Sequence, residues 1–427
     1  MISVEFALTP EEKAILEGKQ GATLQKVMES VVLYGQVFGA KRLVPLDSPV
    51  HLVTSFGMPL LKPVFAMMDE LIAAGLKTEK PFTVDPRPID YTNVPCNPLE
   101  KLIFTIMYGK QKEYEKLLSK VGLKDENAFT CTCYLPEVGN IPARGDRLAW
   151  AESSAVVFAN SVIGARSNRN SGIIEFFCGI LGKAPEFGLL TDEGRRAKWL
   201  VEVKTSRLPN AQLLGSAIGM KVVEDVPYIT GLDRFLGTEL TATVKDYLKD
   251  MGAASASNGA VGLYHVENLT PEAVEQGRSL LVKDYRTYTI DDQELERVFA
   301  SYPEMWKQPA ARPKLCFIGC PHLSLPQLES WLERITGALA KAGRAKVAIP
   351  TFLCAAPDVC QAFAKDRTRY ERLLASGVRL TSMCALMYMN NPLCAKKPVI
   401  TNSNKLRTYT TAKFLLDDDV LARIVNG

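Results

Sequence analysis

Three cysteines far apart in the chain each follow a short β-like run. They are Cys131, Cys320 and Cys384, which follow residues 128–130, 314–319 and 378–383. Thiolates at strand ends can converge on one iron site and leave a coordination position open for a substrate. An electron-transfer centre normally uses all four thiolates. The residue types therefore indicate an iron site at which a small molecule binds.

Spacing alone does not decide which cysteines converge. Cys133 lies two residues beyond Cys131, so both side chains would share one face of a regular strand. Cys354 follows the predicted strand 346–353 and has an equally good position. On the residues alone, Cys133 and Cys354 remain alternatives to Cys131 and Cys384.

Polar residues gather where a plain core element would be apolar. The segments Trp-Ala-Glu-Ser-Ser-Ala (150–155) and Asn-Ser-Val-Ile-Gly-Ala-Arg-Ser-Asn-Arg-Asn-Ser-Gly (160–172) combine cap residues with arginine, which suits an anionic ligand. Arg166 and Arg169 would share a face on a helix, and in a loop they would clamp a carboxylate or phosphate. Lys405, after the last predicted strand, could also bind an anion; the alternative is a surface lysine without such a role.

Two histidines are further candidates. His322, two residues after Cys320, would either orient a substrate or pack at a helix N-terminus. Ser48 and His51 resemble a nucleophile and its base, but no elbow motif or third member accompanies them. A serine hydrolase is therefore one alternative.

The elements that position these residues are clearest from residue 311 onward. Predicted strands alternate with helices there, at residues 314–319, 346–353, 378–383 and 397–400. A capping box, Ser-Leu-Pro-Gln (324–327), opens one helix. The alternation predicts an α/β fold with parallel sheets flanked by helices, whose ligands bind beyond the carboxyl ends of the strands. Earlier in the chain, residues 9–39 are predicted as helix, with Thr9 as the cap of Thr-Pro-Glu-Glu (9–12), and residues 252–262 as a flexible segment.

Composition narrows the class of protein. A chain of 427 residues suggests two or three domains, and we expect an N-terminal α/β region over 1–310 and a C-terminal α/β domain over 311–427. The net charge of +4 and the lack of a dense Lys/Arg block give no nucleic-acid footprint. We see neither a signal peptide nor an 18-residue apolar stretch, so a cytoplasmic protein without a membrane span is expected.

Taken together, five segments resemble the large subunit of the aconitase X family. They are Cys-Thr-Cys-Tyr (131–134), the segments 150–155 and 160–172 quoted above, Gly-Cys-Pro-His-Leu-Ser (319–324) and Thr-Asn-Ser-Asn-Lys (401–405). The resemblance covers nearly the whole chain and implies an aconitase-superfamily-like fold of several domains. It implies an iron or iron–sulfur centre of open type held by Cys131, Cys320 and Cys384. It also implies a small swivelling domain on a separate chain, the small subunit, which carries a catalytic Ser.

The chemistry that the resemblance implies is dehydration by a lyase, in which iron polarises the leaving hydroxyl and a base removes the neighbouring proton. The implied catalytic residues are Glu152, Ser153, Ser154 and His322. The residues implied to hold the anionic substrate are Arg166, Asn168, Arg169 and Lys405.

The family acts on two known substrates. One branch dehydrates cis-3-hydroxy-L-proline to a pyrroline-2-carboxylate, and the other dehydrates (R)-5-phosphomevalonate in isoprenoid synthesis. The forms Asn-Arg-Asn-Ser-Gly (168–172) and Cys-Thr-Cys-Tyr (131–134) resemble the first branch, so dehydration of cis-3-hydroxy-L-proline in hydroxyproline catabolism is the expected function. The alternatives are phosphomevalonate dehydratase and, in another class, a non-catalytic iron-binding or scaffold subunit.

Overall fold

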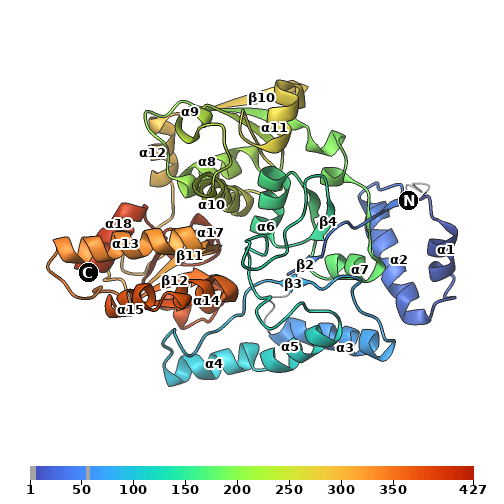
Figure 1. Cartoon of the computed structure of the whole chain (residues 1–427), viewed down its shortest axis with the longest axis horizontal. Helices are drawn as coiled ribbons and strands as arrows, with labels where there is room; N and C mark the ends of the chain where they lie inside the picture. Colours follow the sequence, from blue (N-terminus) through green and yellow to red (C-terminus); the bar gives the residue numbers. More distant parts are fainter. Residues whose placement is uncertain (1–5, 54–57) are drawn as a thin grey trace.

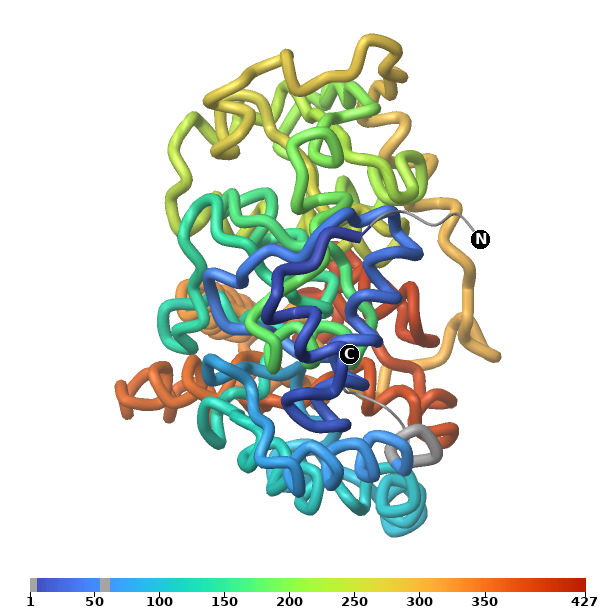
Figure 2. Tube along the Cα trace, turned by 90° about the vertical axis from the view of Figure 1, so that its right-hand side faces the viewer, coloured from blue at the N-terminus to red at the C-terminus, as the bar shows by residue number. Residues whose placement is uncertain are grey.

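Parallel sheets flanked by helices make up the protein, as the computed structural model of residues 6–53 and 58–427 shows. Residues 197–300 form the upper part of the molecule in Figure 1, and residues 311–427 form the part on the left, next to the central sheet. The side view in Figure 2 has residues 197–300, green to yellow, at the top and the helices of residues 98–120 at the bottom. The predicted α/β class is confirmed. The division into 1–310 and 311–427 stays a prediction.

The central sheet has four parallel strands in the order β3-β2-β4-β5. These strands are β2 (His51–Leu52), β3 (Thr83–Val84), β4 (Arg147–Trp150) and β5 (Arg166–Arg169). Beside this sheet lies an antiparallel pair, β1 (Leu43–Pro45) and β6 (Lys183–Pro185). The strands of the central sheet are short, so residues at their carboxyl ends lie close to the loops that follow.

Helices surround the central sheet. They are α1 (Pro10–Leu16), α2 (Ala22–Val37), α3 (Met58–Ala73), α4 (Pro98–Tyr108), α5 (Gln111–Lys120), α6 (Ser153–Phe158) and α7 (Ile174–Leu181). The helix predicted over residues 9–39 begins at the Thr9 cap as expected, but it is two helices. Gly18 and Gly21 interrupt it with φ values of 76° and 101°, which glycine adopts without strain.

The second region contains a parallel sheet in the order β10-β7-β8-β9. Its strands are β7 (Ala197–Val203), β8 (Pro227–Thr230), β9 (His265–Val266) and β10 (Leu281–Ile290), and its helices are α8 (Ala211–Val222), α9 (Asp233–Leu236), α10 (Ala242–Asn258), α11 (Pro271–Gln276) and α12 (Asp292–Ala300). Residues 259–262 of the segment predicted as flexible form a loop, but the prediction is wrong for residues 252–258, because α10 continues to Asn258. Its small residues serve close helix packing: a Cβ on Gly215 of α8 would meet the Met251 carbonyl oxygen at 2.1 Å.

The C-terminal region is a five-stranded parallel sheet in the order β13-β12-β11-β14-β15. Its strands are β11 (Leu315–Leu323), β12 (Thr351–Ala355), β13 (Val378–Thr381), β14 (Val399–Thr401) and β15 (Lys413–Phe414), and its helices are α13 (Leu325–Lys341), α14 (Pro357–Lys365), α15 (Arg367–Ala375), α16 (Ala385–Met389), α17 (Asn404–Tyr409) and α18 (Asp417–Asn426). The capping box at Ser324 is confirmed. No helix among the described residues is long and apolar enough to cross a membrane.

The carboxyl ends of the central and C-terminal sheets meet. The backbone of Arg87, just beyond β3, forms a parallel bridge with Met383, and its carbonyl accepts a hydrogen bond of 2.8 Å from the Cys384 amide. Loops from both sheets therefore approach one place, and parallel α/β sheets bind ligands at such ends.

Candidate active site

The three cysteines lie at the place where the two sheets meet. Cys131 follows an extended segment in which the Thr130 amide donates to the Val84 carbonyl at 2.8 Å. Cys320 lies inside β11, not after it as predicted, where pairing with β12 is interrupted between Ile318 and Leu323. Cys384 caps the N-terminus of α16, beyond the end of β13. All ten cysteines are free thiols.

The ammonium of Lys405, on α17, acts on all three thiols. Burial raises the pKa of Cys131 and of Cys320, and it raises the pKa of Cys384 to about 12. The Lys405 ammonium partly offsets burial at each thiol. Thiols from three distant segments are therefore close enough to one cation to respond to its charge.

The alternative cysteines lie near the site but are placed differently. Cys133 has no exposed surface, burial raises the pKa of its thiol, and the charges of Glu152 and Cys131 raise that pKa further. Cys354, 1% exposed on β12, lies close enough to Cys320, Cys384 and Cys131 for their charges to raise its pKa further, after burial. The choice of Cys131 over Cys133 stays a prediction, and Cys354 is a fourth thiol beside the site.

Glu152 and Lys405 form an ion pair that is largely buried. Glu152 is the N-cap of α6, and its carboxylate accepts hydrogen bonds from the Ala155 amide at 2.7 Å and the Ser154 hydroxyl at 2.6 Å. Burial opposes ionisation of Glu152, but Lys405 and these hydrogen bonds outweigh it, so the pKa is lowered. The Ser153 hydroxyl lies 3.4 Å from Lys405 Nζ. The structure thus brings together four of the predicted residues.

His322 uses both ring nitrogens within the protein. Nε2 lies 3.4 Å from the Met383 carbonyl, which only accepts, so Nε2 carries the proton. Nδ1 then accepts from the Thr130 hydroxyl at 3.0 Å. Burial lowers the pKa of His322 to about 4. A neutral imidazole with both nitrogens occupied suits a positioning role better than the predicted catalytic one.

The three residues predicted to bind the anion, Arg166, Asn168 and Arg169, all lie on β5. Because successive side chains of a strand point to opposite faces, Arg166 and Asn168 share one face and Arg169 lies on the other. Arg166 is paired with Asp192 at 2.6 Å. Asn168 donates to the Phe187 carbonyl at 3.0 Å and accepts from the Leu189 amide at 2.8 Å. These two side chains are thus occupied by neighbouring loops on one face of β5.

Arg169 projects from the other face of β5. Among the described residues, its guanidinium has no ion-pair or hydrogen-bond partner, and burial lowers its pKa while the charges of Tyr409 and Glu152 raise it. An unpaired, largely buried cation close to Glu152 is suited to an anionic ligand.

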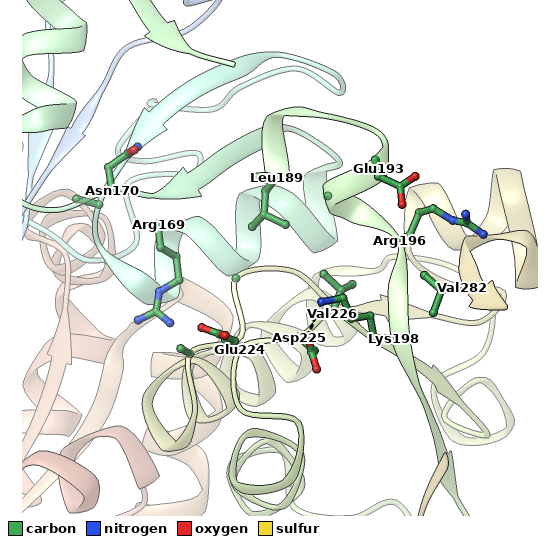
Figure 3. Close-up of a pocket in the computed structure, with 14 residues that line it drawn as sticks. Arg169, Asn170, Leu189, Glu193, Arg196, Lys198, Glu224, Asp225, Val226 and Val282 are labelled. Atoms are coloured by element: carbon green, nitrogen blue, oxygen red, sulfur yellow. Dashed lines mark ion pairs between the residues drawn. The ribbon is translucent and has the colours of Figure 1, made fainter. Parts of the chain in front are cut away.

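A cavity of about 550 Å³ borders Arg169. Figure 3 shows Arg169 and Asn170 on one side of it, and Lys198, Glu224 and Asp225 from the second region on another. Lys198 and Asp225 are paired at 3.1 Å, as the dashed line marks. Arg169 is therefore the unpaired cation that a ligand entering from this cavity would meet near Glu152.

The donor set around Lys405 fits an iron–sulfur centre, although the described residues include no group of three His, Cys, Asp or Glu side chains arranged to hold one metal ion. Each thiolate of an iron–sulfur cluster can bind a different iron, so its ligands need not approach one another as closely as those of a single ion. The chemical identity of the donors, thiols beside a cation, is the observation that supports the fit.

Ser48 and His51 do not form a hydrolase pair. The Ser48 hydroxyl donates to Asp146 at 2.6 Å, while His51 Nδ1 pairs with the Thr83 hydroxyl at 2.9 Å. The serine hydrolase alternative is therefore not supported by the geometry.

Two polar residues near the site were not predicted from the sequence. Asp85 directly follows β3, is 7% exposed, and its charge raises the pKa of the Cys384 thiol. Lys249, in the middle of α10, is 1% exposed. A Pro-rich context hid the strand before Asp85, and nothing in the sequence around Lys249 distinguishes it from a surface lysine.

Glu175, on α7, leads to a prediction of pH-dependent stability. Its Oε1 accepts from the Val53 amide at 3.1 Å, and its Oε2 has no hydrogen-bond partner among the described residues. Burial raises the pKa of Glu175 from 4.5 to about 8, so the folded protein holds this proton more tightly than the unfolded chain. The contribution of Glu175 to the free energy of unfolding should therefore fall as the pH rises from about 4.5 to about 8.

Glu175→Gln should remove this dependence and stabilise the protein by up to about 3 kcal/mol at pH 8.5. Urea unfolding at pH 5.5 and 8.5 measures the effect, with Glu186→Gln, in a partly exposed pair with Arg42, as the control. Equal pH dependence in parent and Glu175→Gln would contradict the prediction.

Comparison with known proteins places this chain in a family. The aconitase X first-domain model matches residues 5–193, and the aconitase X second-domain model matches residues 197–300. The chain therefore belongs to the aconitase X family. Its fold resembles the crystal structure of aconitase X from Thermococcus kodakaraensis in the holo form, with a TM-score of 0.80 and 30% identity over 97% of this chain and 99% of that one.

Similar curated proteins carry two activities. The phosphomevalonate dehydratase large subunit of Thermococcus kodakarensis is 34% identical over 82% of each chain, and that of Methanocaldococcus jannaschii is 28% identical over 94% of each. The cis-3-hydroxy-L-proline dehydratase of Pseudomonas aeruginosa is 29% identical over 66% of this chain and 47% of its own length. Both activities are dehydrations, so the chain is an enzyme of the hydro-lyase class.

Proposed function

We propose that this chain is the large subunit of a two-subunit dehydratase that eliminates water from (R)-5-phosphomevalonate. One observation carries the choice of substrate: the chain matches named phosphomevalonate dehydratase large subunits over 82% and 94% of both lengths. The hydroxyproline dehydratases are longer, and the chain spans 47% and 66% of them. A cytoplasmic location belongs to the proposal, because free thiols suit a reducing compartment.

Cis-3-hydroxy-L-proline is the second candidate substrate. The segments Asn-Arg-Asn-Ser-Gly (168–172) and Cys-Thr-Cys-Tyr (131–134) favour it. Both candidates carry a carboxylate and a hydroxyl group, so the same elimination would serve either of them.

In this proposal, Cys131, Cys320 and Cys384 hold an iron–sulfur centre, which supplies a Lewis acid for the leaving hydroxyl when bound. Arg169 binds the substrate carboxylate, and the Glu152–Lys405 pair fixes the Lys405 ammonium beside the thiols. The half-buried Ser153 faces the substrate, while Ser154 supports Glu152.

The elimination also needs a base. The substrate loses a proton from one carbon and hydroxide from the next, and together these leave as water. Glu152 is a poor base because its pKa is lowered, and the ring nitrogens of His322 are occupied. We assign proton removal to a serine of the small subunit, which is the partner expected for a large subunit.

The test is water elimination by the two-subunit complex, purified anaerobically and offered both substrates. Turnover of phosphomevalonate supports the proposal, and turnover of cis-3-hydroxy-L-proline alone replaces it with the second candidate. Turnover of neither by an iron-loaded complex would favour a non-catalytic iron-binding or scaffold subunit.

Arg169→Gln tests the carboxylate contact. Losing a charge-assisted hydrogen bond costs about 1.5 to 3 kcal/mol, so KM should rise about 10- to 100-fold with little change in the free energy of unfolding. Arg166→Gln is the matched control on the same strand, and it should lower stability by less than about 1 kcal/mol, because Asp192 in the pair that it breaks is 91% exposed. Steady-state kinetics and urea unfolding separate the two effects. A larger KM change in Arg166→Gln than in Arg169→Gln would reverse the assignment.

A further inference from the structure

The last residues of β11, directly after Cys320, are hydrogen-bonded to the segments that carry the other two cysteines. The His322 amide donates to Cys131 Sγ at 3.3 Å, and the His322 ring contacts the Thr130 hydroxyl and the Met383 carbonyl, at 3.0 and 3.4 Å. Thr130 precedes Cys131, and Met383 precedes Cys384. One residue therefore links all three thiol-bearing segments.

Lys249, on α10 of the second region, forms a hydrogen bond with His322. Its ammonium donates to the His322 carbonyl at 3.2 Å and to the Gln327 side chain, and it lies 3.2 Å from the Asp246 carboxylate. With 1% exposure, the side chain is enclosed. A buried ammonium requires such partners, because an unpaired charge is costly in the interior.

Further hydrogen bonds fix these partners in turn. The Asp246 carboxylate accepts from the Ser324 hydroxyl at 2.6 Å, and the Gln327 amide group donates to Asp250 at 2.9 Å. Ser324 lies two residues beyond His322 and forms the capping box of α13 with Gln327. The ammonium thus joins α10 to the start of α13 and to His322 at the end of β11.

We propose that Lys249 is a positioning residue for the three-cysteine site, acting through His322. The inference rests on the proposed function in that the cysteines are taken to hold iron. Without the ammonium, the His322 carbonyl and the Asp246 carboxylate lose their buried donor. The end of β11 then relaxes, and the link between the thiol-bearing segments loosens. Outer partners of metal ligands act in this way in other metal sites.

Lys249→Met tests the proposal, because it keeps the length of the side chain and removes the charge. The complex is loaded with iron anaerobically, and the rate of iron transfer to a chelator is measured at a temperature where every variant is folded. We expect iron to be held about 10- to 100-fold more weakly than in the parent, with a changed visible absorption spectrum. Lys245→Met, exposed on the same helix, is the matched control and should behave as the parent.

A second readout does not need iron. In the metal-free protein, alkylation of individual cysteines by iodoacetamide is followed by mass spectrometry. Lys249→Met should raise the alkylation rates of Cys131 and Cys320 and leave that of Cys360 unchanged. Should Lys249→Met fail to fold, Lys249→Gln, which keeps an N–H donor, should show the same changes at smaller size.

The outcomes distinguish the two claims. Iron retention and alkylation rates equal to the parent, with only a lower melting temperature, would reduce Lys249 to a structural role and leave the proposed function standing. A parent complex that binds no iron would remove the iron assignment, and the alkylation rates would then decide whether Lys249 positions the thiols.

Discussion

Cys320→Ala is expected to abolish water elimination and to reduce the iron retained by the complex. A Lewis acid is worth several kcal/mol to a reaction of this kind, and about 4 kcal/mol corresponds to about 1,000-fold in rate. The rate should therefore fall by at least about 1,000-fold. The protein should stay folded, because Cys320 is half-buried and a smaller side chain leaves little empty space there.

Cys360→Ala is the control for this variant. Cys360 is also half-buried, but it lies on α14, and its thiol makes one weak hydrogen bond, to the Ala355 carbonyl at 3.6 Å. Iron content and the elimination rate should stay at the level of the parent. Normal iron content in Cys320→Ala would remove Cys320 from the ligand set, and the same measurement on Cys354→Ala would then show whether Cys354 replaces it.

Lys405→Met should lower both stability and activity. Removing one partner of a buried ion pair leaves the other charge uncompensated and typically costs about 3 to 5 kcal/mol. Glu152 is 6% exposed, so its carboxylate has little access to water. In the parent, the lowered pKa of Glu152 gives stability that is present above its unfolded pKa of 4.5. In the variant, burial raises that pKa, so the loss should grow between pH 5 and pH 8.

Urea unfolding at those two pH values measures this loss. Lys413→Met is the control, because its pair with Glu304 is partly exposed and should contribute less than about 1 kcal/mol. The double variant Lys405→Met with Glu152→Gln should recover part of the stability, since no charge is then left unpaired. A deficit that is equal at pH 5 and pH 8 would show that the ion pair is not the cause.

Local sequence signals predicted much of the fold. The caps at Thr9 and Ser324 and the alternation of strands and helices after residue 311 are confirmed, because cap chemistry and strand patterning act over a few residues. The flexible segment predicted over residues 252–262 is wrong for residues 252–258, because this run of Gly, Ala and Ser in α10 serves close packing on α8, a tertiary requirement. Nothing in the local pattern distinguishes such a run from a flexible linker.

Local sequence signals predicted less of the candidate site than of the fold. Arg166, Asn168 and Arg169 appeared equivalent until the strand showed that two of them are occupied by neighbouring loops. The family resemblance implies a catalytic role for His322, and the sequence could not show that Thr130 and Met383, distant along the chain, occupy its ring nitrogens. Roles that depend on which groups are already hydrogen-bonded become visible only in three dimensions.

The meeting of two sheets at the site also sets the order in which the enzyme can be completed. Lys405 leaves the ribosome after Cys131, Glu152 and Cys320. Its charge pairs with Glu152 and partly offsets the effect of burial on the pKa of the thiols. N-terminal parts of a chain generally fold first during synthesis. A nascent chain that stops before α17 would therefore present the thiols without their cation. The arrangement of charges around the thiols is therefore complete only once α17 has been synthesised.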